Sequence, residues 1–173
     1  MIFGMTTATY TLVHVLISLA GIASGFVVMY GLLTGKRLDR WNALFLVTTV
    51  ATSVTGFGFP FIHLSPAHKV GILSLVALAI AIVARYVLHL AGAWRRTYVV
   101  CAALALYFNV FVLVVQLFEK VPALRALAPT QKEPPFLISQ LAVLAIFVGL
   151  TIVALKRSHS EPVAVVPAVG RAA

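Results

Sequence analysis

The chain has 173 residues, of which 62% are hydrophobic and only 10% are charged. Ordinary soluble domains contain roughly 45–50% apolar and about 25% charged residues, so this composition excludes a water-soluble globular fold. The formal net charge of +9 does not indicate nucleic-acid binding, because the basic residues form short clusters at the ends of apolar stretches.

Five apolar stretches follow one another along the chain. A stretch of roughly 18 or more apolar residues can cross the hydrocarbon core of a membrane as a helix. The predicted helices cover residues 8–33, 41–59, 66–91, 96–118 and 135–155. They predict an all-α integral membrane bundle in a single domain, 1–157. The small, proline-containing segment 158–173 is expected to be a disordered tail.

Local signals set several of these boundaries. Gly56, Gly58 and Pro60 end the second stretch. Ser65 can cap the third helix, whose first position is Pro66. The longest loop, EKVPALRALAPTQKEPP, contains a short stretch, VPALRAL, that can lie along the membrane interface.

The distribution of basic residues predicts the orientation, because cytoplasmic loops carry an excess of Lys and Arg. One side of a five-helix bundle receives Lys36, Arg37, Arg40, Arg95, Arg96, Lys156, Arg157 and Arg171. The other side receives only Lys69, Lys120, Arg125 and Lys132. We therefore expect the amino terminus outside and the carboxyl terminus in the cytoplasm. The first helix lacks a preceding basic segment and is expected to remain in the mature protein.

The first helix carries a face of small and polar residues: His14, Ser18, Gly21 and Gly25. The simpler interpretation is a tight helix contact, with the His14 side chain hydrogen-bonded across it. The sharper hypothesis is that the small residues leave room for a planar cofactor, with His14 as its axial ligand.

The third helix begins near His68, and Gly71 lies one turn further along. Two neutral imidazoles from two helices can clamp the iron of a b-type haem. The sequence therefore suggests His14 and His68 as haem ligands between the first and third helices, near the outer face. An ordinary interfacial position for His68, in contact with lipid headgroups, is the alternative. No other metal is expected.

Asn109 and Gln116 lie on one face of the fourth helix, with Glu119 close to that face. Amides in apolar helices commonly hydrogen-bond to neighbouring helices. If the outer half holds a site, Gln116 and Glu119 would line its rim. Arg85 is expected to extend toward cytoplasmic headgroups, with a substrate-anchoring or quinone-anchoring role as the alternative.

Two runs, SPAHKVGILSLVALAIAIVARY and ALYFNVFVLVVQLFEKVPALRALAPTQKEPPF, resemble stretches of uncharacterised small inner-membrane proteins of bacteria. The resemblance implies location in a bacterial inner membrane. It carries no activity and assigns no functional residue.

Three functional hypotheses follow. The most concrete is binding of a b-type haem or similar redox cofactor. The second is a small transport, channel or accessory subunit in which Asn109 and Gln116 face a polar path. It would act in a homo-oligomer formed through Gly21 and Gly25 or with a partner membrane subunit. The third is an enzyme acting on lipid headgroups, with the outer histidines and Glu119 as acid and base. The sequence names no catalytic residue and does not decide whether the protein is an enzyme.

Overall fold

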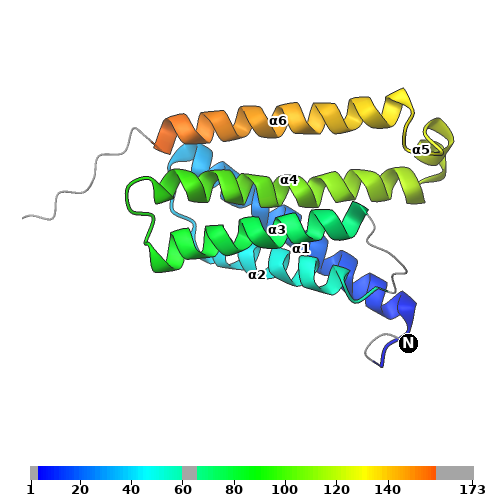
Figure 1. Ribbon diagram of the computed structural model, residues 1–173, viewed down its shortest axis with the longest axis horizontal. Helices are drawn as coiled ribbons and strands as arrows, with labels where there is room; N and C mark the ends of the chain where they lie inside the picture. Colours follow the sequence, from blue (N-terminus) through cyan, green and yellow to red (C-terminus); the bar gives the residue numbers. More distant parts are fainter. Residues whose placement is uncertain (1–3, 60–65, 159–173) are drawn as a thin grey trace, which may run out of the picture.

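The computed structural model describes residues 4–59 and 66–158, and this part of the chain is helical without a strand (Figure 1). The elements are α1 (Thr7–Thr34), α2 (Asp39–Gly56), α3 (Pro66–Ile82), the π-helix η1 (Val83–Val87), α4 (Trp94–Lys120), the short α5 (Pro122–Leu127) and α6 (Pro134–Ser158). The helix η1 continues α3 directly. Of the predicted tail, Ser158 is the last residue of α6 and the rest lies outside the described residues, as does the cap predicted at Ser65.

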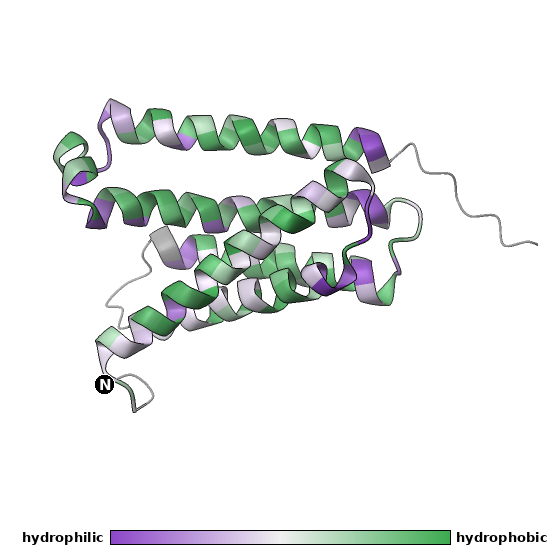
Figure 2. Ribbon diagram, turned by 180° about the vertical axis from the view of Figure 1, so that it is seen from behind, coloured by the Kyte–Doolittle hydropathy of each residue, from purple (hydrophilic) through white to green (hydrophobic). Residues whose placement is uncertain are grey.

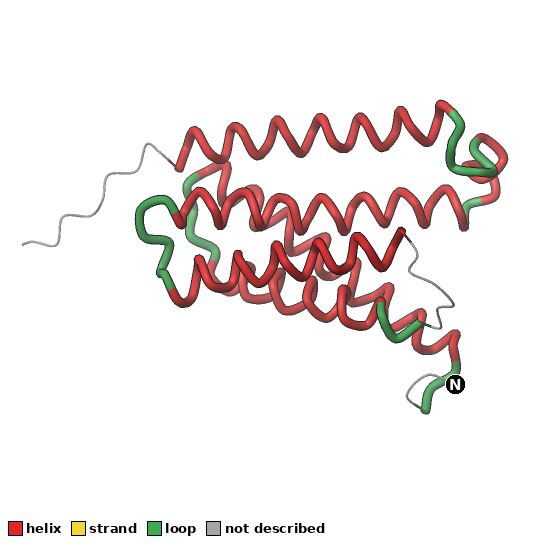
Figure 3. The backbone as a smooth tube through the Cα atoms, in the orientation of Figure 1, coloured by secondary structure: helices red, strands yellow, loops and turns green. Residues whose placement is uncertain are grey.

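The five long helical segments alternate in direction, as the backbone tube in Figure 3 shows. The bundle therefore has two ends. One, which we call the N-terminal end, contains the starts of α1, α3 and α6. The other, which we call the basic end, contains the ends of α1, η1 and α6 and the starts of α2 and α4. In Figure 2 apolar residues run along the helices, and hydrophilic residues gather at the ends of the bundle.

Four helical segments are long and apolar enough to cross a membrane: Thr7–Thr34, His68–Val87, Trp94–Lys120 and Pro134–Ser158. The chain is therefore a multi-pass membrane protein, as its composition predicts. The remaining predicted crossing, 41–59, corresponds to α2, which is not among these four. Asp39, Arg40 and Asn42 in its first turn and its run of threonines reduce its hydropathy.

Local interactions explain where the first and last helices begin and end. The Thr6 side chain accepts a hydrogen bond from the Thr9 N–H at 3.2 Å, which caps α1. Gly35 ends α1 in the left-handed conformation at φ 71°, which glycine adopts without steric cost. Before α6, the Glu133 carboxylate accepts bonds from the Thr130 backbone N–H at 3.2 Å and from its hydroxyl at 2.9 Å.

The third predicted helix, 66–91, differs from the structure in its last turns. The helix widens into η1, where the Leu88 N–H donates to the Val83 carbonyl at 3.0 Å. Residues His89 and Leu90 then adopt left-handed backbone conformations, with φ values of 48° and 58°. The helix therefore ends at Val87, four residues before the predicted end at residue 91.

The helix α4 is the centre of the bundle, because it packs against α1, α2, α3 and α6. The core between these helices contains Phe45, Leu78, Tyr98 and Leu106, all almost fully buried. The helix α2 packs against both α1 and α3. By contrast, α6 packs along α4 and α1, and much of its remaining apolar surface is exposed. In a membrane this surface faces lipid.

The glycine face of α1 is used inside the chain. A Cβ atom on Gly25 would lie 2.5 Å from Leu106 Cδ1 and 2.9 Å from Phe45 Cε2. At Gly21 it would lie 3.3 Å from the Thr48 hydroxyl oxygen. The two glycines therefore let α1 approach α2 and α4 closely. Within one chain this face is therefore in contact with α2 and α4, and an oligomer contact through Gly21 and Gly25 stays a prediction.

We expect Gly25→Ala to destabilise the bundle by about 1–3 kcal/mol, because the new methyl group overlaps with Leu106 and Phe45. Gly149→Ala in α6 is the matched control, since no atom lies within 4 Å of its added Cβ. Thermal unfolding of the detergent-solubilised protein, followed by circular dichroism, measures both. Equal stability of the two variants would contradict the close approach.

Candidate functional site

At the N-terminal end, His14 is held by the end of α2. Its Nδ1 lies 2.8 Å from the Thr55 hydroxyl oxygen, and its ring meets the Phe59 ring edge-on at 5.2 Å. The Thr55 hydroxyl also lies 2.7 Å from the Ala51 carbonyl oxygen. When this hydroxyl donates to Ala51, it accepts from the Nδ1–H of His14. The other ring nitrogen, Nε2, is then the acceptor of the neutral imidazole.

His68 lies at the same end, on the other side of α2. Its ring packs against the Phe57 ring at 5.6 Å. The two histidines thus contact different residues of one segment, 55–59, and α2 packs between their helices. A Cβ on Gly71 would lie 3.4 Å from the Phe57 ring. The side chains of Thr48 and Thr49 therefore lie beside Gly21, and that of Phe57 lies beside Gly71, where the haem hypothesis expects space for a cofactor.

The polar residues of α4 separate into two environments. Asn109 is buried, and its amide donates to the Thr49 hydroxyl at 3.4 Å, so it joins α4 to α2. Gln116 and Glu119 are exposed, and Glu119 lies 3.9 Å from Lys120. A polar path formed by Asn109 and Gln116 together stays a prediction. Gln140 of α6 was not predicted as a site residue, yet its buried side-chain amide donates to the Phe111 carbonyl oxygen at 3.3 Å.

The described residues contain no group of three or more His, Cys, Asp or Glu side chains that could hold a metal ion. Haem ligation needs only two such side chains, so ligation by His14 and His68 stays a prediction.

A second set of residues surrounds a cavity of about 590 Å³ at the basic end. Its lining comes from α1, α2, η1, α4, α6 and the loops beside them. Five of the lining side chains are cationic: Lys36, Arg37, Arg85, Arg95 and Arg157. Among the described residues that line the cavity, Asp39 is the only acidic one. The cavity therefore favours anions.

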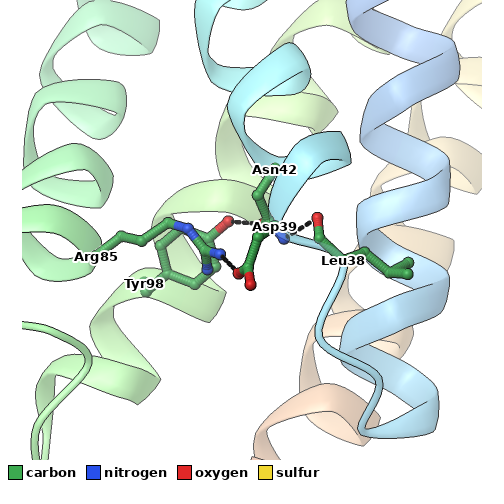
Figure 4. Close-up of polar contacts among 5 residues, drawn as sticks. All are labelled: Leu38, Asp39, Asn42, Arg85 and Tyr98. Atoms are coloured by element: carbon green, nitrogen blue, oxygen red, sulfur yellow. Dashed lines mark hydrogen bonds and ion pairs between the residues drawn. The ribbon is translucent and has the colours of Figure 1, made fainter.

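Three side chains hold Arg85 in place, and Figure 4 shows two of them, Asp39 and Tyr98. It forms an ion pair with Asp39 and lies over the rings of Tyr98 and Tyr86, at 5.4 Å and 5.8 Å from their centroids. Only 13% of the Arg85 side chain is exposed. Contacts of a guanidinium with aromatic faces are favourable and become stronger when water is excluded. The arrangement fixes the guanidinium at the cavity.

Tyr98 is itself fixed by hydrogen bonds. Its hydroxyl donates to the Asn42 side-chain carbonyl oxygen, and the Asn42 amide donates to the Leu38 carbonyl at 2.8 Å. The network runs from η1 through α4 to the start of α2 (Figure 4). Tyr98 is 1% exposed, so an unmade bond here would leave a buried polar atom unsatisfied. The wall of the cavity behind Arg85 is therefore rigid.

The backbone beside this wall is strained. Both His89 and Leu90 line the cavity, and both have the positive φ values that glycine adopts most easily. Such conformations cost on the order of 1–3 kcal/mol each and occur often at functional sites. Single π-helical turns, such as η1, also occur frequently at functional sites. These features favour a binding role for the cavity.

The sequence contained one signal for this site. Arg85 follows a long apolar run, and an ionisable residue in a membrane helix is by default a candidate functional residue. The alternative of a substrate-anchoring role for Arg85 pointed in this direction. The contribution of Tyr98, Asn42 and Asp39 depends on how the helices are rotated, which the sequence pattern does not give.

No protein-family model, curated protein or solved structure matches this chain. Its function is therefore inferred from its own residues and geometry.

The haem hypothesis predicts sharp reduced-minus-oxidised absorption bands from the purified protein, at near-stoichiometric levels when haem precursor is abundant. His14→Ala and His68→Ala should each abolish them, because each removes one axial ligand. His89→Ala, at the basic end, is the control and should leave the bands unchanged. A flat spectrum of the unaltered protein would contradict the hypothesis, as would bands that survive both outer substitutions.

Proposed function

We propose that this protein binds the phosphate group of an anionic lipid headgroup in the cavity at its basic end. The observation that carries the proposal is the lining of that cavity, with five cationic side chains and one carboxylate. Basic pockets between membrane helices on the cytoplasmic side are typical sites for phospholipid headgroups. Arginine suits this role because its planar guanidinium can donate two parallel hydrogen bonds to a phosphate.

A lipid is favoured over a soluble anion by the apolar part of the lining. Val28, Leu32, Leu90 and Val99 contribute apolar side chains beside the cations. Exposed aromatic residues at the same end, including Trp41 and Trp94, are typical of a membrane interface. A headgroup in the cavity could therefore keep its glycerol and acyl chains in contact with apolar surface.

The proposal includes the topology. We propose five crossings of a bacterial inner membrane, with the amino terminus outside and the basic end in the cytoplasm. The 18 residues of α2 extend about 27 Å at 1.5 Å per residue, close to the thickness of the hydrocarbon core. Its neighbours α1 and α3 are both apolar enough to cross. The excess of Lys and Arg at the basic end supports the orientation.

The topology is tested by labelling single cysteines in intact cells with a membrane-impermeant maleimide, in a Cys101→Ala background. We expect Lys69→Cys and Lys132→Cys to be labelled and Lys36→Cys to be protected until the membrane is opened. Labelling of both Lys36→Cys and Lys69→Cys would show that α2 does not cross. The reverse pattern at all three positions would contradict the orientation.

Headgroup binding is tested with the detergent-solubilised full chain and short-chain lipids. We expect phosphatidylglycerol to bind more tightly than phosphatidylcholine, because only the former has a net negative charge. Arg85→Gln should weaken phosphatidylglycerol binding about tenfold or more, as expected for loss of charge-assisted hydrogen bonds. Lys132→Gln removes one positive charge at the opposite end and serves as the control.

Inorganic phosphate forms the second arm of this experiment. Tight binding of phosphate without a preference for phosphatidylglycerol would identify the ligand as a soluble anion. Equal binding of both lipids, unaffected by Arg85→Gln, together with no binding of inorganic phosphate, would contradict an anion site in this cavity.

A further inference from the structure

We infer that Arg85 is the residue that anchors the phosphate, and that Asp39 is an internal competitor which the phosphate displaces from it. This inference rests on the proposed function, because it concerns how that cavity takes its ligand. It assigns opposite roles to the two partners of one ion pair: removal of Arg85 should weaken binding, and removal of the Asp39 carboxylate should strengthen it.

The two partners differ in how freely they can move away. The Arg85 side chain is 13% exposed and the Asp39 side chain is 75% exposed. A carboxylate that is already mostly hydrated loses little when it leaves the ion pair, because water replaces the contact. A guanidinium that is mostly buried has no comparable replacement. When a second anion enters the cavity, Asp39 is therefore the partner that yields.

Arg85 does not depend on Asp39 for its position. Its guanidinium lies over the rings of Tyr98 and Tyr86, and Tyr98 is fixed by its hydrogen bond to Asn42. These contacts remain when the carboxylate moves away. The ion pair uses Nη2 of Arg85, whereas a guanidinium carries five N–H donors. A phosphate can therefore bind the same group through two parallel bonds while both rings still hold it.

The Asp39 carboxylate is still stabilised after it leaves the ion pair with Arg85. Asp39 is the first residue of α2, and a carboxylate at a helix amino terminus interacts favourably with the helix dipole. Its negative charge also repels an entering phosphate before the ion pair opens, because it is the one acid among the described residues of the lining. Both the competition and the repulsion lower the apparent affinity of the wild-type protein.

The test measures the dissociation constant of phosphatidylglycerol for the full chain in detergent. We expect Asp39→Asn to bind about twofold to fivefold more tightly, the factor typical of releasing an exposed ion pair. Asp39→Ser is a second variant that removes the same charge with a smaller side chain, so an effect that both variants share arises from loss of the carboxylate. Glu119→Gln is the matched control, because it removes the same charge from an exposed position at the N-terminal end. It should leave the affinity unchanged.

A double variant shows whether the gain acts through Arg85. In an Arg85→Gln background, Asp39→Asn should raise the affinity for phosphatidylglycerol only by the part that arises from weaker charge repulsion. The effects of the two substitutions on binding should therefore not be additive.

Weaker binding by both Asp39 variants would overturn the inference and would identify Asp39 as a positioning residue for Arg85. An equal gain from Glu119→Gln would overturn it too, because net charge alone would then explain the effect. If neither the wild-type chain nor the Asp39 variants bind phosphatidylglycerol, the proposed function fails together with this inference.

Discussion

In lipid, helices gain little from burying apolar side chains against one another, because the acyl chains are equally apolar. The bundle therefore depends on close approach of backbones and on hydrogen bonds between helices. Gly25 provides the approach, since Phe45 of α2 and Leu106 of α4 fill the space that a side chain would occupy. The Asn109 bond to Thr49 joins the same two partners, α2 and α4, one helical turn from that contact along α4. The position of α2, the least apolar of the long helices, follows from these contacts.

The same dependence on interhelical contacts extends to the basic end. Tyr98 of α4 hydrogen-bonds to Asn42 of α2, and its ring supports Arg85 of η1. The consecutive elements η1 and α4 are therefore joined to α2, which is distant from them in sequence (Figure 4). Basic residues that support the proposed orientation also line the cavity there. The proposed orientation and the proposed anion site therefore rest on the same excess of cations at one end of the bundle.

The sequence predicted the helical membrane bundle well, because long apolar runs have few other structural outcomes. The apolar runs of α1, α4 and α6 agree with the predicted ranges to within a few residues. The predicted crossing 41–59 was less well determined, because Asp39, Arg40 and several threonines make α2 resemble a helix of a soluble protein. The residues that surround His14 and His68 could not be predicted, because the sequence pattern does not encode that α2 packs between α1 and α3. Periodicity places a residue on a face, and only packing decides which helix that face meets.

The cavity was harder to foresee than the helices, because it depends on the irregular end of the third helical segment. A regular helix to residue 91 would have placed Arg85 and His89 one above the other on the same face. The wider turn of η1 and the left-handed residues His89 and Leu90 end the helix instead and turn the chain along the cavity. Glycine at either position would adopt this backbone at lower cost. The side chains present there contribute what glycine could not: Leu90 packs against the core, and His89 forms part of the wall that faces the cationic lining. The strain is therefore located where a side chain is needed beside the candidate ligand.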